Sequence, residues 1–338
     1  MPIDDFEVLG RIGEGAHGVV VKAKNLQNGD IVALKKIYLK RLEEGISMQA
    51  FREIQALRHL HHENIICMRE VFPHGSSLVF VFDYMVTDLS ELIKDYESPL
   101  TEKQIKAYMI QLLSGVAYMH ETGIMHRDLK PANLLVSNNG QLKIADFGLA
   151  RLISTERSRP LSHQVATRWY RAPELLYGAK FYGPGVDIWS VGCIFGEMIN
   201  CSPLFPGEND IEQLVCVFQQ LGTPTTADWA GLSDLPDYGK ITFADYSPRP
   251  MNEIVPEAGP KAADLLSRLL VYDSQKRIEA KHALIHDYVL SFPLAATLDE
   301  LPKPKPKPLT KQQHANVVID FDRSLDELLL IPDVHDSP

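Results

Sequence analysis

The strongest constraint on what this chain can fold into is a polar run near its middle. Residues 126–133 read HRDLKPAN, and residues 146–148 read DFG. A single Asp or Asn in a loop is usually a turn former or a helix cap. Two carboxylates, an amide and an ammonium in this order instead predict a site built for chemistry, because each group can fill a different role.

Phosphoryl transfer is the reaction that needs this set of groups. It requires a carboxylate to orient the attacking hydroxyl, oxygen ligands for magnesium, and positive charge beside the moving phosphoryl group. Asp128 suits the first role, Asn133 and Asp146 suit the second, and Lys130 suits the third. The spacing from Asp128 to Asn133 also matches the catalytic loop used for this reaction.

Composition and charge exclude several other classes of protein. The 338 residues are 45% hydrophobic and 23% charged, which is typical of a globular chain long enough for two lobes. The net charge of −10 argues against a nucleic-acid binder. The four cysteines form no metal-type pair, so we expect free thiols in a reducing compartment. The acidic N-terminus and the short apolar run at 188–199 predict neither a signal peptide nor membrane insertion.

A glycine-rich string lies near the N-terminus. Gly13, Gly15 and Gly18 form Gly-x-Gly-x-x-Gly, which dinucleotide-binding folds also carry. In those folds a helix follows the glycines. Here three valines follow at 19–21, and their β-branched side chains favour a strand. We therefore expect a β-hairpin tip whose backbone N–H groups can face phosphates, and a dinucleotide-dependent enzyme is a distant alternative.

Lys35 ends the pattern Val-Ala-x-Lys in the next predicted strand. Strand alternation places it on one face with Ala33, and Lys36 on the other face, where we expect it in solvent. An ammonium beside a small apolar residue needs anionic partners, and ATP phosphates and a carboxylate are suitable. The expected carboxylate is Glu53, on a helix predicted over 48–60, although a surface glutamate is the plainer alternative.

The apolar strand predicted over 79–85 is expected to end in a linker between lobes whose backbone binds the adenine edge. Apolar residues from both lobes would sandwich the ring, although each could equally be ordinary core. The predicted ATP-binding residues are Ile12, Gly13, Glu14, Gly15, Ala16, His17, Gly18, Val20, Ala33, Lys35, Phe82, Asp83, Met85, Asp88 and Leu135.

A polar segment with few apolar anchors lies between DFG and the string APE at 172–174. Such a segment can be ordered by phosphorylation where basic side chains await the phosphate. Arg52, Arg127 and Arg151 are expected to converge there. Because Arg127 adjoins Asp128, a phosphate bound by these arginines would act directly on the catalytic loop.

Other residues are expected to support the fold. A capping box of Thr101 and Gln104 begins a helix predicted over 101–121. Asp187 is expected to cap backbone groups under the catalytic loop, and Arg277 to pair with Glu174. A further helix is predicted over 210–221, closed by Gly222 and Pro224.

The composition changes after Phe292. Residues 302–308 read PKPKPKP and must be extended. We expect a spacer, and a partner-binding segment is the alternative. Phe321, Leu325 and Leu328 then fit one face of a short helix or turn, which could dock on this chain or on another protein. The predicted domains are an N-lobe at 1–85, a hinge and C-lobe at 86–292, and a tail at 293–338.

Together these motifs resemble the eukaryotic serine/threonine protein kinase family, from Phe6 to about Phe292. The string VATRWYRAPE at 165–174 is similar to the cyclin-dependent kinase branch. Within it, GRIGEGAHG, FPHG, HQVATR and LPDY most resemble the cell-cycle-related kinases, which are associated with cell-cycle control and cilia. The resemblance implies an α+β bilobal fold, with a small β-rich N-lobe carrying one regulatory helix and a larger, mainly helical C-lobe.

The resemblance also implies function. It predicts an ATP- and Mg²⁺-dependent kinase acting on protein Ser or Thr followed by proline, found in cytoplasm and nucleus and at the cilium. Arg171 would shape the proline pocket, and Thr167 would bridge Asp128 and Lys130. Ser162 stands where the branch carries its activating phosphothreonine, so an upstream kinase would act on it.

Two departures from the branch matter. Ala16 and His17 replace the inhibitory Thr-Tyr pair, so that brake should be absent. Residues 47–53 read SMQAFRE, where only the final Arg and Glu match the cyclin-binding helix, so the activating subunit is cyclin-like or of another kind. The alternative of another class is a pseudokinase scaffold, which replacement of Lys35, Asp128 or Asp146 would favour, and none is replaced.

Overall fold

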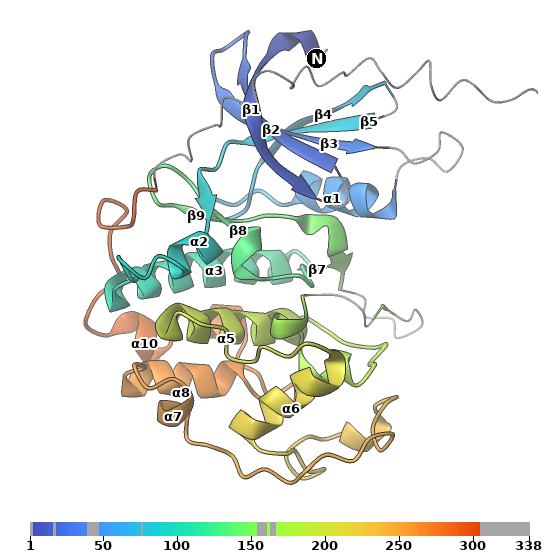
Figure 1. Ribbon diagram of the computed structural model, residues 1–338, viewed down its shortest axis with the longest axis vertical. Helices are drawn as coiled ribbons and strands as arrows, with labels where there is room; N and C mark the ends of the chain where they lie inside the picture. The colour runs from blue at the N-terminus through green and yellow to red at the C-terminus, as the bar shows by residue number, and fades with distance from the viewer. Residues whose placement is uncertain are drawn as a thin grey trace, which may run out of the picture. The chain divides into compact units, whose positions relative to one another are not determined.

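The computed structural model describes residues 3–15, 18–38, 47–75, 77–153, 161–162 and 167–304. The chain divides into two compact units. Of the described residues, the first contains those up to Phe51 together with Ile66–Met85, and the second contains Arg52–Ile65 and residues 86–304. Figure 1 labels their elements.

The first unit is an antiparallel sheet with strand order β1-β2-β3-β5-β4, seen in Figure 1. Val21, Val32 and Val79 lie in its core, where the rings of Phe6 and Phe72 stack 6.1 Å apart. The strands are β1 (Phe6–Gly15), β2 (Gly18–Asn25), β3 (Ile31–Tyr38), β4 (Met68–His74) and β5 (Ser77–Asp83), preceded by the 3₁₀ turn η1 (Ile3–Asp5).

The glycine string forms a hairpin tip, as predicted. Gly15 pairs with Gly18 across β1 and β2, and no helix follows. Gly18 has φ +148°, and a Cβ atom there would lie 1.7 Å from the carbonyl oxygen of Lys36. Only glycine allows the strands to approach this closely. The expectation that Lys36 lies in solvent is wrong, because the residue is buried and only 6% exposed.

Helix α1 (Met48–His59) occupies the span predicted for it to within one residue. The second unit is mainly helical and also carries small sheets, β6-β8-β9 and β10-β7. Its helices are α2 (Leu89–Ile93), α3 (Glu102–Glu121), α4 (Pro173–Leu176), α5 (Gly185–Asn200), α6 (Asp210–Leu221), α7 (Met251–Ile254), α8 (Pro260–Leu269), α9 (Ala280–Ala283) and α10 (Asp287–Leu290). Its strands are β6 (Thr87–Asp88), β7 (Ile124–Met125), β8 (Leu134–Val136), β9 (Leu142–Ile144) and β10 (Arg151–Leu152).

The longer helices begin and end where local chemistry predicts. The Thr101–Gln104 capping box is present, and α3 ends just before Gly123, whose φ is +77°. Asn209 caps α6 by accepting a hydrogen bond from the backbone of Glu212, and Gly222 closes the helix. Among the helices described, not one combines the length and the apolar character that crossing a bilayer requires.

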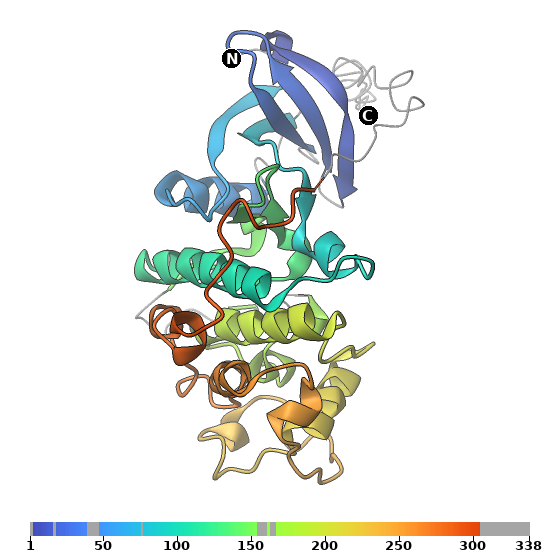
Figure 2. The same ribbon diagram turned by 90° about the vertical axis from the view of Figure 1, so that its left-hand side faces the viewer.

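The segment that follows α10 packs along the second unit as a strap, residues 291–304, which Figure 2 shows passing beside α3. Lys106 of α3 is fully buried, and its ammonium donates to the backbone oxygens of Ser291, at 2.8 Å, and Pro293. Burial lowers the pKa of Lys106. Gln104 donates to the backbone oxygen of Glu300 at 2.8 Å, and Leu301 is 3% exposed. The predicted helix or turn around Phe321 lies outside the described residues.

Candidate active site

The catalytic loop is held from beneath by Asp187 near the start of α5. This carboxylate is fully buried and accepts hydrogen bonds from the backbone nitrogens of His126, at 2.9 Å, and Arg127, at 2.8 Å. It also accepts one from Nε2 of His120 at 2.9 Å. Burial alone raises the pKa of Asp187, but His120 and the backbone N–H of Arg127 lower it overall. The predicted capping role of Asp187 is therefore confirmed.

These bonds hold the loop in a strained shape. Arg127 has φ 69°, a left-handed conformation that an arginine adopts only where its surroundings impose it. Asp146 also has a left-handed backbone, with φ 63°. Phe147 beside it is fully buried, and its ring centre lies 4.8 Å from that of His126.

Asp128 is the centre of a small hydrogen-bond network. Its Oδ1 accepts from the backbone N of Thr167 at 2.8 Å and from the hydroxyl of Thr167 at 3.2 Å. Its Oδ2 accepts from Nζ of Lys130 at 3.0 Å and from Nδ2 of Asn133 at 3.1 Å. Lys130 also donates to the Thr167 hydroxyl at 2.8 Å, so the structure contains the predicted bridge. The carboxylate is thus fixed on both oxygens.

Asn133 and Asp146 are brought together by the backbone. The N–H of Ala145 donates to the backbone oxygen of Asn133 at 2.9 Å, so Asp146 follows directly. The side-chain amide nitrogen of Asn133 donates to both the backbone and the carboxylate of Asp128, which orients its amide oxygen away from them. An amide oxygen and a carboxylate are hard donors that fit Mg²⁺, which keeps water or phosphate oxygens as its other ligands.

The first unit carries the other predicted groups. Val20 lies opposite Lys35 across β2 and β3, and Ala33 lies opposite Phe82 across β3 and β5. Ile12, Gly13, Glu14 and Gly15 belong to β1 and Asp83 ends β5, with Met85 just beyond, whereas Ala16 and His17 lie outside the described residues. The meeting of Lys35 with Asp128, Asn133 and Asp146 would join the two units, and it stays a prediction.

Three predicted residues have informative surroundings in the second unit. Glu53 is 2% exposed, which contradicts the alternative of a surface glutamate. Asp88 pairs with Leu135 across β6 and β8. Its carboxylate also caps α2 by accepting from the backbone of Ser90 at 3.0 Å. The sequence analysis missed both the strand β6 and this cap, because two residues are too few for a periodic pattern.

The three arginines predicted to converge do so. Burial and the positive charges of Arg127 and Arg151 lower the pKa of Arg52. Within the part of the chain that the structure describes, Nε of Arg52 is buried without a hydrogen-bond partner. Arg127 donates to the Tyr182 hydroxyl at 2.8 Å, and Tyr182 donates in turn to the backbone oxygen of Ser162. An exposed serine thus lies beside a group of cations.

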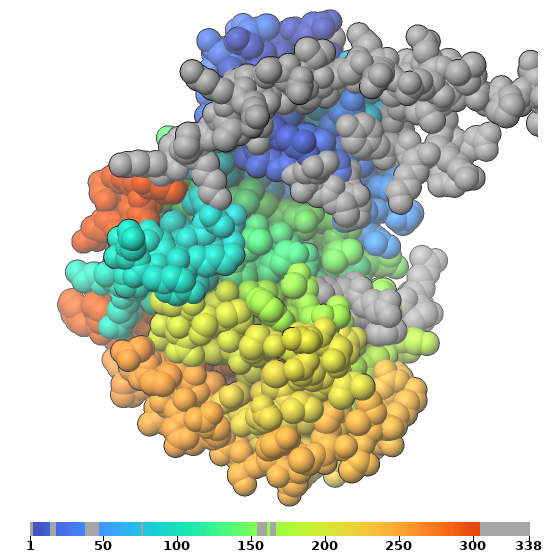
Figure 3. Space-filling model, in the orientation of Figure 1, coloured from blue at the N-terminus to red at the C-terminus, as the bar shows by residue number. Residues whose placement is uncertain are grey.

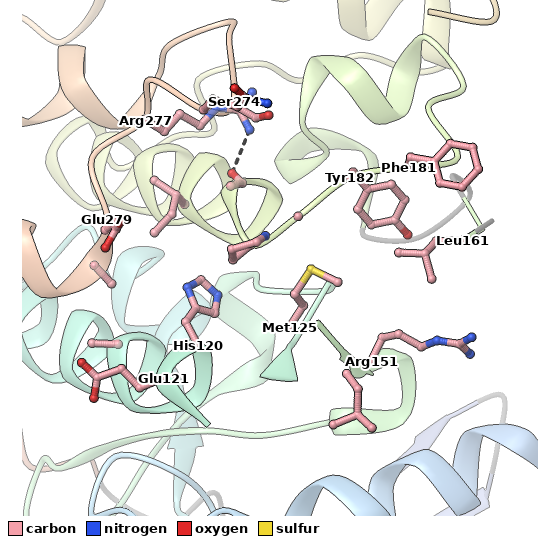
Figure 4. Close-up of a pocket in the computed structure, with 18 of the residues that line it drawn as sticks. His120, Glu121, Met125, Arg151, Leu161, Phe181, Tyr182, Ser274, Arg277 and Glu279 are labelled. Atoms are coloured by element: carbon pink, nitrogen blue, oxygen red, sulfur yellow. Dashed lines mark hydrogen bonds between the residues drawn. The ribbon is translucent and has the colours of Figure 1, made fainter. Parts of the chain in front are cut away.

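Tyr182 was not predicted, since a single tyrosine before a helix resembles ordinary core. It also lines a cavity of about 1080 Å³ within the second unit, shown in Figure 4. His120, Met125 and Arg151 line the same cavity. Arg277 also lines it and donates to the backbone oxygen of Gly185 at 2.8 Å. None of the catalytic-loop groups lines this cavity, whereas Arg151 of the arginine cluster does.

Comparison with known proteins agrees with this site. The model of the protein kinase domain family matches residues 6–289. Cyclin-dependent kinase 20 of Danio rerio is 56% identical over 333 residues, covering 98% of this chain and 97% of that protein. Cyclin-dependent kinase 20 of Homo sapiens is 52% identical over 341 residues, covering 98% of each.

A solved structure is similar along most of the chain. It is the CAK complex of Chaetomium thermophilum bound to ATP-gamma-S, with a TM-score of 0.83 and 36% identity over 89% of this chain and 96% of that chain. Fold, motifs and relatives therefore agree on both the family and its branch. This chain belongs to the protein kinase family, and within it to the serine/threonine kinases of the cyclin-dependent type.

Proposed function

We propose that the chain transfers the γ-phosphoryl group of ATP to Ser or Thr residues followed by proline in protein substrates. The network around Asp128 is the observation that carries this proposal. Asp128 accepts the proton of the substrate hydroxyl as the hydroxyl oxygen attacks the γ-phosphorus. The bond from that phosphorus to the bridging oxygen breaks, and ADP leaves. Thr167 and Asn133 keep the carboxylate pointed at the hydroxyl.

Cations of the chain would balance the phosphate charges. Lys130, 3.0 Å from Asp128, offsets charge on the γ-phosphate, and Lys35 holds the α- and β-phosphates. Asn133 and Asp146 would hold Mg²⁺, which supplies charge neutralisation when bound. ATP binding is supported by the family and by the nucleotide analogue bound to the similar CAK complex. The intact set of groups opposes the pseudokinase alternative.

Arg171 supports the preference for proline. Its side chain is 12% exposed and lies in the segment that directly follows Thr167, where the residue after the phosphoacceptor would bind. Two peptides that differ only in Ser-Pro or Ser-Ala test this. We expect ATP- and Mg²⁺-dependent phosphorylation with a higher kcat/KM for Ser-Pro. Equal values for the two peptides would contradict proline selectivity.

Phosphorylation of Ser162 by an upstream kinase would activate the enzyme. Ser162 lies beside Tyr182 and Arg127, and a phosphate there would supply an anion for the three arginines. We expect Ser162→Ala to lower kcat/KM roughly tenfold, the effect of about one charge-assisted hydrogen bond. The rate of phosphate transfer by protein treated with an activating kinase is the measurement. Ser202→Ala, at an exposed serine of the same unit, is the control.

Equal rates for Ser162→Ala and the unmodified chain would show that the arginine cluster is not used.

The same proposal includes an activating subunit, cyclin-like or of another kind, and roles in the cell cycle and the cilium. Cytoplasm and nucleus, and the cilium, are the proposed locations. The cyclin-dependent relatives and the similar CAK complex support the activating subunit.

A further inference from the structure

Two arginines of the segment after Thr167 share one carboxylate oxygen. Nε of Arg168 and Nη1 of Arg171 each lie 3.0 Å from Oδ1 of Asp210, the first residue of α6. The segment that contains α6 lies on the surface of the second unit, as Figure 3 shows. Asp210 therefore joins the substrate side of the catalytic loop to the start of a helix.

The two arginines differ in their need for Asp210. The Arg171 side chain is 12% exposed, whereas that of Arg168 is 40% exposed and that of Asp210 is 45% exposed. Burial and the charge of Arg168 lower the pKa of Arg171, and the charge of Asp210 raises it. Arg168 can exchange its partner for water, but Arg171 is largely removed from water. The carboxylate thus matters most to the buried guanidinium.

Asp210 is not the only connection between the segment and α6. Arg168 also donates to the backbone oxygen of Glu208 at 2.8 Å. Nε1 of Trp169 donates to the backbone oxygen of Gly207 at 3.1 Å, and Gln213 donates to the backbone oxygen of Trp169 at 3.4 Å. Loss of the Asp210 carboxylate would leave these three bonds in place. Its main effect would be on the orientation of a planar guanidinium.

We propose that Asp210 is a positioning residue for substrate selectivity, which fixes the Arg171 guanidinium as a wall of the pocket for the residue after the phosphoacceptor. Arg168 shares the same oxygen but is not required for this effect. The inference rests on the proposed function in one respect, since it takes Arg171 as part of the proline pocket. It adds that an acidic residue outside the catalytic loop sets how strongly proline is preferred.

The experiment compares kcat/KM for the Ser-Pro and Ser-Ala peptides in the full-length chain and its variants. We expect Asp210→Ala to lower the ratio of the two values about tenfold, the size of one hydrogen bond to a charged group. Asp210→Asn keeps an acceptor oxygen and should retain an intermediate ratio. Arg168→Leu removes the other arginine but leaves the Asp210–Arg171 pair, so its ratio should stay within about twofold.

Glu212→Ala is the matched control for an acidic residue at the start of α6. Its carboxylate accepts from the backbone N of Glu208 at 3.0 Å and contacts neither arginine in the described contacts. The inference would be overturned if the ratio were unchanged in Asp210→Ala, or if it fell equally in Arg168→Leu. In either case, a preference for Ser-Pro in the unmodified chain would still uphold the proposed function. A ratio near one in the unmodified chain would overturn both. Thermal melting identifies folded variants, and Asp210→Asn serves if Asp210→Ala does not fold.

Discussion

Asp128→Asn should lower kcat by about 10²–10⁴-fold, the usual contribution of a positioned general base. The substitution keeps the size of the side chain but removes the group that accepts the hydroxyl proton. The new amide NH₂ group would face hydrogen-bond donors at either oxygen position of Asp128. These donors are Thr167 at Oδ1, and Lys130 and Asn133 at Oδ2. Transfer of labelled phosphate from ATP to a Ser-Pro peptide is the measurement.

Asp299→Asn is the matched control for this experiment. Its carboxylate is 99% exposed, so the same chemical change there should leave kcat unaltered. Thermal melting of both variants separates loss of catalysis from loss of folding. Transfer that survives Asp128→Asn unchanged would reject the assignment of the base. Absence of transfer in the folded, activated unmodified chain would favour a nucleotide-binding scaffold.

Arg277→Ala should lower the free energy of unfolding of the second unit by about 3–5 kcal/mol, the cost of leaving a buried charge unpaired. Nη1 and Nη2 of Arg277 each lie 2.7 Å from an oxygen of Glu174, and the two side chains are 0% and 6% exposed. The guanidinium also lies 5.1 Å from the ring centre of Trp189. The substitution therefore isolates a carboxylate and opens a gap beneath a tryptophan.

Urea denaturation followed by Trp fluorescence measures this loss. Arg268→Ala is the control, because Arg268 pairs with Asp264 at 3.1 Å but is 56% exposed. Exposed pairs contribute up to about 1 kcal/mol, so its midpoint should change little. Similar midpoints for the two variants would show that the Glu174–Arg277 pair contributes no more than a surface pair.

The parts of the fold that follow from local chemistry were predicted well. Helix α6 has the predicted bounds because Asn209 and Gly222 cap it, and the hairpin at Gly18 follows from valines that favour strands. The arrangement of Asp128 was also predictable, since its partners are near in sequence or part of an ordered motif. Arg277 and Glu174 are far apart in sequence, and their predicted pairing is confirmed.

Some residues whose role depends on distant contacts were not predicted. Nothing near Asp210 in sequence indicates that it receives two arginines from another segment, and Tyr182 gives no sign of its bond to Arg127. Lys36 is buried although we expected it in solvent, because strand alternation says which face a residue occupies and not what covers that face.

The strap makes contacts that composition does not predict. The chain after Phe292 was predicted as a tail because its composition changes there, and residues 291–304 lie along α3. Lys106 and Gln104 hold it by main-chain oxygens, which every residue type offers in the same place. The helical unit therefore determines the path along which the chain leaves it. Exposed side chains of the departing segment, such as Asp299, can be exchanged without changing that path.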